Sequence, residues 1–251
     1  SISKWAPSCI GSYAQAALMT GYVPLAGQIG LLPGTMQLAC DTRSQLMQCV
    51  DNCTAVADCL KADMKQPLCT TLFVHAECQH SDNEISDMLA RRIATPFLLA
   101  RVKALPRHAD VELVPHLLLN ALWKTFAELS LDFNERADSL EQLRGVPEHA
   151  FSFVKQVSQE DDLDAVEQAA LERFRMSPDT VVVRTLYTTV PREVSPRWNS
   201  VSCRALALSH ASEFTPVQSV VHLVAVDHAQ VHTSAWLAQQ HSVLSLKAPS
   251  H

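Results

Sequence analysis

The chain has 251 residues, with 26 acidic and 20 basic side chains, 47% hydrophobic residues and only 6 glycines. This length allows one large domain or two small ones, each able to bury a core of its own. A formal net charge of −6, without a block of Lys and Arg, argues against a nucleic-acid or anionic-membrane surface. No apolar run reaches the roughly 18 residues of a membrane span, and no signal-peptide pattern opens the chain. We therefore expect a cytoplasmic protein, and the Ser at position 1 leads us to expect a piece of a longer one.

The glycines are concentrated at the N-terminal end of the chain. Five of the six fall within the first 34 residues, at positions 11, 21, 27, 30 and 34, and Gly145 is the sixth. Their spacing matches neither a Walker A loop nor the G-x-G-x-x-G dinucleotide pattern, and no G-x-S-x-G elbow is present. The sequence thus argues against a phosphate-cradling loop and against a hydrolase nucleophile elbow.

The first half of the chain predicts an α+β unit with helices on one face of a sheet. A helix should begin at Asp41 or Thr42 and end near Leu60, because apolar residues recur there at helical spacing. Ser81 and Glu84 form a capping-box pattern that opens a second helix, which should end near Ile93. Apolar and β-branched runs predict strands over 22–31, 68–76, 97–105 and 109–119.

The second half predicts the same order of elements, which indicates an internal duplication. Residues 122–147 are polar, with apolar residues at roughly helical spacing, and predict a helical connector. Helices are expected over 159–175 and 196–211, and strands over 152–158, 180–190, 215–227 and 231–238. The thiols of Cys49 and Cys53 should be small buried groups of the first helix. His222, His228 and His232 lie on the last two strands, as ordinary strand histidines or as metal or proton-transfer groups.

The N-terminal motif resembles that of a known family. Residues Gly11-Ser12-Tyr13-Ala14-Gln15-Ala16 and Ala26-Gly27-Gln28-Ile29-Gly30 resemble the G-P-Y-S-Q-A and S-G-Q-I-G signatures of the RidA/YjgF family, also named endoribonuclease L-PSP. The resemblance spans residues 1–121. Its opening, S-I-S-x-W-A-P-S-C-I-G, is most similar to the tandem C-terminal RidA-like modules of eukaryotic diphthine–ammonia ligases.

The resemblance implies two tandem RidA-like (chorismate-mutase-like) units, each a mainly antiparallel sheet with helices on one face. The expected divisions are a RidA-like domain over 1–121, the connector over 122–147, a diverged second domain over 148–241 and a tail over 242–251. Family members form homotrimers with a ligand cleft between subunits. Here the chain should either form a homo-oligomer or pair its two units intramolecularly.

The active deaminases of the family clamp the carboxylate of a 2-imino acid with an Arg and position water with a Glu of the last strand. Carrying these positions over gives Phe97 in place of the Arg and Val114 in place of the Glu. Arg101, on the same predicted strand face as Phe97, is the candidate substitute. Glu112 is a candidate carboxylate that should face solvent or an interface. The pocket candidates are therefore Tyr13, Gly27, Gln28, Ile29, Phe97, Arg101 and Glu112, with no catalytic residue and no metal ligand assigned.

These substitutions favour a non-catalytic assembly, regulatory or ligand-binding region of a diphthine–ammonia ligase. Such ligases use ATP and ammonium to amidate diphthine on elongation factor 2, in diphthamide biosynthesis. The S-G-G-x-D-S loop that handles ATP is absent from the 251 residues, so ATP is expected only for a separate ligase domain and no cofactor for this chain. Elongation factor 2 is the partner expected through the longer protein. The alternatives are a deaminase that hydrolyses 2-imino acids to 2-keto acids and ammonia, and an L-PSP endoribonuclease, which the acidic balance disfavours.

Overall fold

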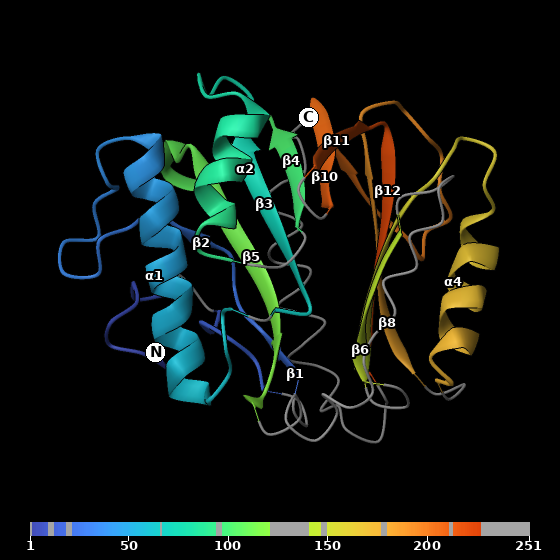
Figure 1. The fold of residues 1–251 in the computed structure, drawn as a ribbon, viewed down its shortest axis with the longest axis horizontal. Coiled ribbons are helices and arrows are strands. Elements are labelled where there is room, and N and C mark those ends of the chain that lie inside the picture. Colours follow the sequence, from blue (N-terminus) through green and yellow to red (C-terminus); the bar gives the residue numbers. More distant parts are fainter. Residues whose placement is uncertain are drawn as a thin grey trace.

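The computed structural model describes residues 2–9, 13–18, 22–65, 67–93, 97–120, 141–146, 150–176, 180–210 and 213–226. These residues build an α+β fold, as predicted, from two β-sheets that lie between helices (Figure 1). Two helices cover the outer face of one sheet and a third covers the outer face of the other. None of the described helices is long and apolar enough to cross a membrane.

The first sheet has the order β1-β5-β3-β4-β10-β11, with β2 paired to β5. Its strands are β1 (Tyr22–Pro24), β2 (Gln28–Ile29), β3 (Cys69–His75), β4 (Leu98–Val102), β5 (Val111–Leu118), β10 (Ala205–His210) and β11 (Glu213–Val217). All of these pairings are antiparallel except that of β3 with β4. The segment predicted as one strand over 22–31 is therefore two short strands. Both of them pair with β5, at different positions along it.

Helices α1 (Thr42–Leu60) and α2 (Asp82–Ala90) begin where the sequence predicts. Asp41 caps α1 by accepting a hydrogen bond from the amide of Ser44 at 2.7 Å. Ser81 and Glu84 form the predicted capping box at the start of α2. The apolar stripe of α1 is buried against the sheet, and it includes the fully buried Cys53.

The second sheet has the order β6-β7-β12-β8-β9. Its elements are β6 (Glu141–Val146), β7 (Ala150–Gln156), α4 (Leu163–Arg173), β8 (Val181–Thr188), β9 (Asn199–Ser202) and β12 (Ser219–Val226). Asp162 caps α4, which begins four residues later than predicted. Between α4 and the sheet lies a separate core that contains Phe151, Phe174, Leu186 and Trp198.

The inner faces of the two sheets pack on each other and form a third core. Phe73 and Val114 of the first sheet belong to the same buried cluster as Val154, Tyr187 and Val220 of the second. The rings of Phe73 and Tyr187 have their centroids 6.0 Å apart. Because aromatic and branched side chains bury large apolar areas, this contact joins the two sheets into one body.

The prediction of a helix over 196–211 is wrong, because that segment forms β9 and β10. Its Ala and Leu residues have good helix propensity, but tertiary pairing overrides this weak preference. Leu206 lies opposite Ala100 and Leu208 opposite Leu98 of β4, on the first sheet. Both leucines are buried in the core between the sheets.

Two other expectations about the second half also need correction. Residues 141–146 form β6, paired with β7, rather than the end of a helical connector, since pairing with a neighbouring strand satisfies their backbone groups. The strand predicted over 215–227 is divided at Gln218 into β11 and β12, which belong to different sheets. The rest of the connector up to residue 140, His228, His232, the strand over 231–238 and the tail over 242–251 lie outside the described residues.

Candidate functional site

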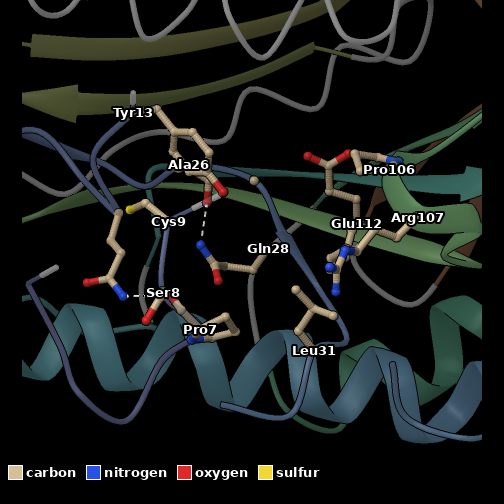
Figure 2. Close-up of a pocket in the computed structure, with 13 residues that line it drawn as sticks. Pro7, Ser8, Cys9, Tyr13, Ala26, Gln28, Leu31, Pro106, Arg107 and Glu112 are labelled. Atoms are coloured by element: carbon tan, nitrogen blue, oxygen red, sulfur yellow. Dashed lines mark hydrogen bonds between the residues drawn. The ribbon is translucent and has the colours of Figure 1, made fainter. Parts of the chain in front are cut away.

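The N-terminal segment, β2, the segment Pro106–His108 and the start of β5 line a cavity of about 230 Å³ (Figure 2). The sequence predicted five of its residues, namely Tyr13, Gly27, Gln28, Ile29 and Glu112. Figure 2 shows Tyr13 and Cys9 on one side of the cavity, Glu112, Arg107 and Pro106 on the opposite side, and Gln28 between them. These residues are far apart in sequence and are brought together by the pairing of β2 with β5.

Gln15 holds the wall of the cavity that Pro7, Ser8 and Cys9 form. The Gln15 side chain is 1% exposed, and its Oε1 accepts hydrogen bonds from the amides of Ile2 at 2.5 Å and Ser3 at 2.8 Å. Its Nε2 donates to the carbonyl oxygens of Ser3 at 3.2 Å and Pro7 at 2.9 Å. One buried amide therefore satisfies four backbone groups of a segment that has no sheet partner of its own.

Gly27 lets the carboxylate of Glu112 lie directly over the backbone. A Cβ atom at position 27 would stand 1.9 Å from Oε1 of Glu112. Glu112 lies on β5 opposite Ile29 of β2 and is 5% exposed, so it faces the cavity rather than bulk solvent. Gly30 has a different role, because a Cβ there would stand 2.5 Å from Cα of Gln45 in α1. The two glycines thus allow a close approach of a carboxylate and of a helix.

The amide of Gln28 lies between the two sides of the cavity. Its side chain is 6% exposed, and its Nε2 donates a hydrogen bond of 3.3 Å to the carbonyl oxygen of Ala26 (Figure 2). This local bond is the one we expect for an amide on a strand. Gln28 also lines the cavity, and its side-chain oxygen is an acceptor that this bond does not use.

Arg107 is a cavity residue that the sequence did not single out. It lies in a short 3₁₀ segment, Pro106–His108, and has left-handed backbone angles of φ 56° and ψ 25°. Its Nη1 donates a hydrogen bond of 2.6 Å to the carbonyl oxygen of Met36, which fixes the direction of an otherwise exposed side chain. The sequence predicts only the strands on either side of this segment, and not the left-handed backbone of the residue that lines the cavity.

The structure places Phe97 and Arg101 away from the cavity. Phe97 is 1% exposed and belongs to the core beneath the helices. Arg101 lies on β4, where its Nε contacts Oδ1 of Asp82 at 2.6 Å and its terminal nitrogens donate to the carbonyl oxygens of Cys78 and His80. The β4 residues in the core between the sheets, which also holds Val114, are Leu98, Ala100 and Val102. Strand alternation therefore separates Arg101 from the face that carries Glu112 and Val114.

A second polar cluster is closed to solvent between the two sheets. The Tyr22 hydroxyl lies 2.5 Å from Nδ1 of His116, and Nε2 of His222 lies 3.3 Å from the Cys69 thiol and 3.2 Å from the Ser152 hydroxyl. The two imidazole rings meet edge to face, with centroids 5.7 Å apart. Burial lowers the pKa of His116 to about 3, helped by the neighbouring His222, and lowers the pKa of His222 to about 4.

This cluster joins the sheets as neutral hydrogen-bonding groups. Among the described residues, no group of three or more His, Cys, Asp and Glu side chains is arranged to hold a metal ion. Burial also raises the pKa of the Cys49 and Cys53 thiols well above the usual range, with Glu112 contributing to both shifts. Thiols in that state are weak nucleophiles, so we treat both cysteines as packing residues.

No protein-family model matches the chain. Among curated proteins, a diphthine–ammonia ligase from Schizosaccharomyces pombe is 31% identical over 117 residues. The match covers 44% of this chain and 18% of the ligase. The chain therefore spans less than a fifth of the length of the curated relative it matches.

Solved structures similar to the chain include proteins of the Rid family. RidA from an Antarctic Psychrobacter species is 23% identical with a TM-score of 0.43, covering 47% of this chain and 96% of its own. The Rid-family protein YyfA from Yersinia pestis is 29% identical with a TM-score of 0.43, covering 47% and 95%. The YjgF gene product of E. coli is 22% identical with a TM-score of 0.41, covering 46% and 94%. The chain is similar in its first half to proteins of the RidA/YjgF family, the family that its N-terminal motifs resemble.

Proposed function

We propose that this chain is a non-catalytic, ligand-binding and assembly region of a diphthine–ammonia ligase, built from two tandem RidA-like units. In this proposal ATP is bound by another part of a longer protein, which acts in the cytoplasm on elongation factor 2. The match to the S. pombe ligase supports the proposal. It covers 18% of that protein, which is what we expect if this chain resembles one region of a longer ligase.

The order of the strands supports two related units. The sheet order β1-β5-β3-β4 has its counterpart in β7-β12-β8-β9. In both sets the first two pairings are antiparallel and the last is parallel, and one helix follows the first strand along the chain. Among the differences, the described residues 189–198 form no helix between β8 and β9, and the β10–β11 hairpin is inserted before β12.

The packing of the sheets supports intramolecular pairing of the two units. The β10–β11 hairpin extends the first sheet by pairing with β4, and the core between the sheets contains residues from both halves of the chain. If the two units did not pack on each other within one chain, the inner face of each sheet would have to be covered by another subunit. We therefore propose that the pairing within one chain replaces an intersubunit contact.

The position of Arg101 is the observation that carries the non-catalytic role. Its guanidinium is engaged by Asp82 and by two backbone carbonyl groups on the helix-covered side of β4. On the other side of β4 stand Leu98, Ala100 and Val102, whose side chains have neither a charge nor a hydrogen-bonding group. An imine hydrolase needs a clamp for the substrate carboxylate and a group that positions water, and β4 offers no such clamp beside Val114.

A graft into the yeast ligase tests the proposal. The 117-residue matching region of the S. pombe enzyme is deleted in one strain and replaced by this chain in another, and amidation of elongation factor 2 is measured by mass spectrometry. We expect the deletion to abolish amidation and the graft to restore it, while the purified chain alone neither amidates the factor nor hydrolyses a freshly generated 2-imino acid faster than buffer. A graft that restores nothing, together with imine hydrolysis by the purified chain, would overturn the proposal in favour of the deaminase.

A further inference from the structure

We infer that Ser195 is a phosphorylation site for a proline-directed serine/threonine kinase, and that Arg197 receives the phosphate group. Ser195 lies in the described segment 189–198, which joins β8 to β9 and contains neither helix nor strand. The site belongs to the second half of the chain, so it requires neither the cavity nor the proposed function.

Four Ser or Thr residues of the chain directly precede a proline, at positions 95, 177, 195 and 215. Proline-directed kinases select such residues, because the subsite after the acceptor takes a residue without a backbone N–H. Thr215 lies on β11, opposite Leu208 of β10, so its backbone is held in the sheet. Positions 95 and 177 lie outside the described residues. Among the described residues, Ser195 is therefore the acceptor that a kinase can reach without opening a strand pair.

The segment presents Ser195 at the tip of a turn. The three residues 195–197 are exposed. Val194 before them and Trp198 after them pack on the core beneath α4. The amide of Trp198 donates a hydrogen bond of 2.9 Å to the carbonyl oxygen of Ser195, which closes a four-residue turn with Pro196 at the favoured second position. Within the described part of the chain the Ser195 hydroxyl makes no hydrogen bond, so it is available to accept a phosphoryl group.

Arg197 is a cation with room for a further anion. Its side chain is 46% exposed, its Nη2 lies 2.7 Å from Oε2 of Glu167, and its Nε lies 3.3 Å from Oδ1 of Asp164. Glu167 is also held by Arg184, through contacts of 2.5 Å and 2.7 Å to its two carboxylate oxygens. If Arg197 turned toward a phosphate at Ser195, the buried carboxylate of Glu167 would therefore keep a partner. A phosphate carries a charge of about −1.5 to −2, so it competes strongly with a single carboxylate for the guanidinium.

Arg197 is also the guanidinium of this segment that is more available to the phosphate. Arg192, three residues before Ser195, is partly buried and donates to two backbone carbonyl oxygens of the segment 158–161. Glu193 is exposed and carries the same sign of charge as a phosphate. Attraction by Arg197 and repulsion by Glu193 both direct the phosphate toward the C-terminal side of the turn.

The modification needs ATP and Mg²⁺, which are supplied with the kinase. Oγ of Ser195 forms a bond to the γ-phosphorus of ATP, while the bond from that phosphorus to the bridging oxygen breaks. The hydroxyl proton passes to the catalytic Asp of the kinase, and ADP leaves. The product carries an added charge of about −1.5 to −2 near neutral pH, on a chain whose formal net charge is −6.

The test is phosphorylation of the purified chain by a mitogen-activated protein kinase with ATP and Mg²⁺, followed by peptide mapping in a mass spectrometer. We expect phosphate on Ser195 of the folded chain. Pro196→Ala should lower the rate at this residue at least tenfold, while Ser200→Ala, at an exposed serine of β9 without a following proline, should leave it unchanged. A synthetic peptide of residues 190–200 is the reference for the sequence alone. Phosphorylation of the peptide but not of the folded chain, or of neither, would overturn the inference.

The recipient of the phosphate is identified by phosphorus NMR titration of the phosphorylated chain. The second pKa of phosphoserine is about 6, and a neighbouring guanidinium lowers it because the guanidinium favours the dianion. Arg197→Gln should therefore raise the pKa of the phosphate on Ser195, whereas Arg204→Gln, at an exposed position beyond β9, should not. Equal pKa values in Arg197→Gln and Arg204→Gln would refute Arg197 as the recipient.

Discussion

Oε1 of Glu112 lies 1.9 Å from the point where a Cβ atom of Gly27 would stand, so the carboxylate occupies the space that any other residue at position 27 would need. Gly27→Ala must therefore displace Glu112 or shift β2 away from β5. We expect a loss of roughly 1–3 kcal/mol in the free energy of unfolding, as for other overpacked sites. Urea denaturation measures it.

Gly34→Ala is the matched control for this substitution. No atom lies within 4 Å of a Cβ built at Gly34, so the change should stay within about 0.5 kcal/mol. In the double variant Gly27→Ala, Glu112→Ala, the clash is absent, and the cost of the alanine at position 27 should fall to about that of the control. Equal costs for Gly27→Ala with and without Glu112 would show that the carboxylate is not the obstacle.

The contribution of Gln15 to the cavity wall can be measured with Gln15→Ala. This substitution leaves four backbone groups of Ile2, Ser3 and Pro7 without their buried partner. We expect a loss of about 1–3 kcal/mol, or local opening of residues 2–9. Opening would raise the rate at which a thiol reagent labels Cys9, which is half-buried in the wall.

Gln37→Ala provides the control, because Gln37 is exposed and its side chain makes no hydrogen bond within the described part of the chain. Stability and Cys9 labelling should both remain at the wild-type values there. If Gln15→Ala labels Cys9 no faster than Gln37→Ala and unfolds at the same urea concentration, the wall does not depend on Gln15.

The first half of the fold was predictable because its signals are local. Asp41 and Ser81 cap helices through hydrogen bonds within three residues, and the strand and helix patterns between them have the expected periods. The cavity was predictable where a motif marks it, as at Tyr13 and Gln28. Arg107 was not, because its left-handed backbone is imposed by the fold and not by a Gly or Asn that the sequence would display.

The second half was less predictable because its decisive contacts are non-local. The segment around Leu206 has helix-forming residues, yet it pairs with β4, a strand about a hundred residues earlier, and with β11. Likewise, Phe97 and Arg101 were placed on one strand face correctly, but the sequence does not say which face the helices cover. That depends on the packing of α1 and α2, which directs Arg101 to Asp82.

The buried histidines predict a loss of stability in acid. Their folded-state pKa values of about 3 for His116 and about 4 for His222 are below the usual 6.5, because burial disfavours the charged form. Below pH 6.5 the unfolded chain therefore binds protons that the folded chain does not, and stability falls as pH falls toward 4. Each histidine should contribute a slope of roughly 1.4 kcal/mol per pH unit within that window.

His222→Gln removes one of these two histidines. Between pH 4 and 6.5 it should lower the slope of the free energy of unfolding against pH by roughly 1.4 kcal/mol per pH unit. Urea denaturation of the wild type and the variant is measured across this pH range. Subtracting one pH profile from the other removes the contribution of the carboxylates, because both proteins contain them. His80→Gln is the control, because this side chain is 38% exposed and lies outside the cluster. An unchanged slope in His222→Gln would mean that this imidazole is not neutral and buried at low pH.

The shared core between the sheets predicts that the two halves of the chain unfold together. Leu208 of β10 is fully buried among residues of both sheets, so Leu208→Ala should cost about 2–4 kcal/mol. Leu18→Ala removes the same atoms from a side chain that is 59% exposed and should cost less than about 0.5 kcal/mol.

Because Phe73 of the first sheet and Tyr187 of the second pack in this core, a loss on either side weakens both sheets. Circular dichroism and tryptophan fluorescence should therefore follow a single transition that shifts to lower urea concentration in Leu208→Ala. Two separate transitions, with only one of them shifted, would mean that the sheets are stable independently and that β10 belongs energetically to one of them.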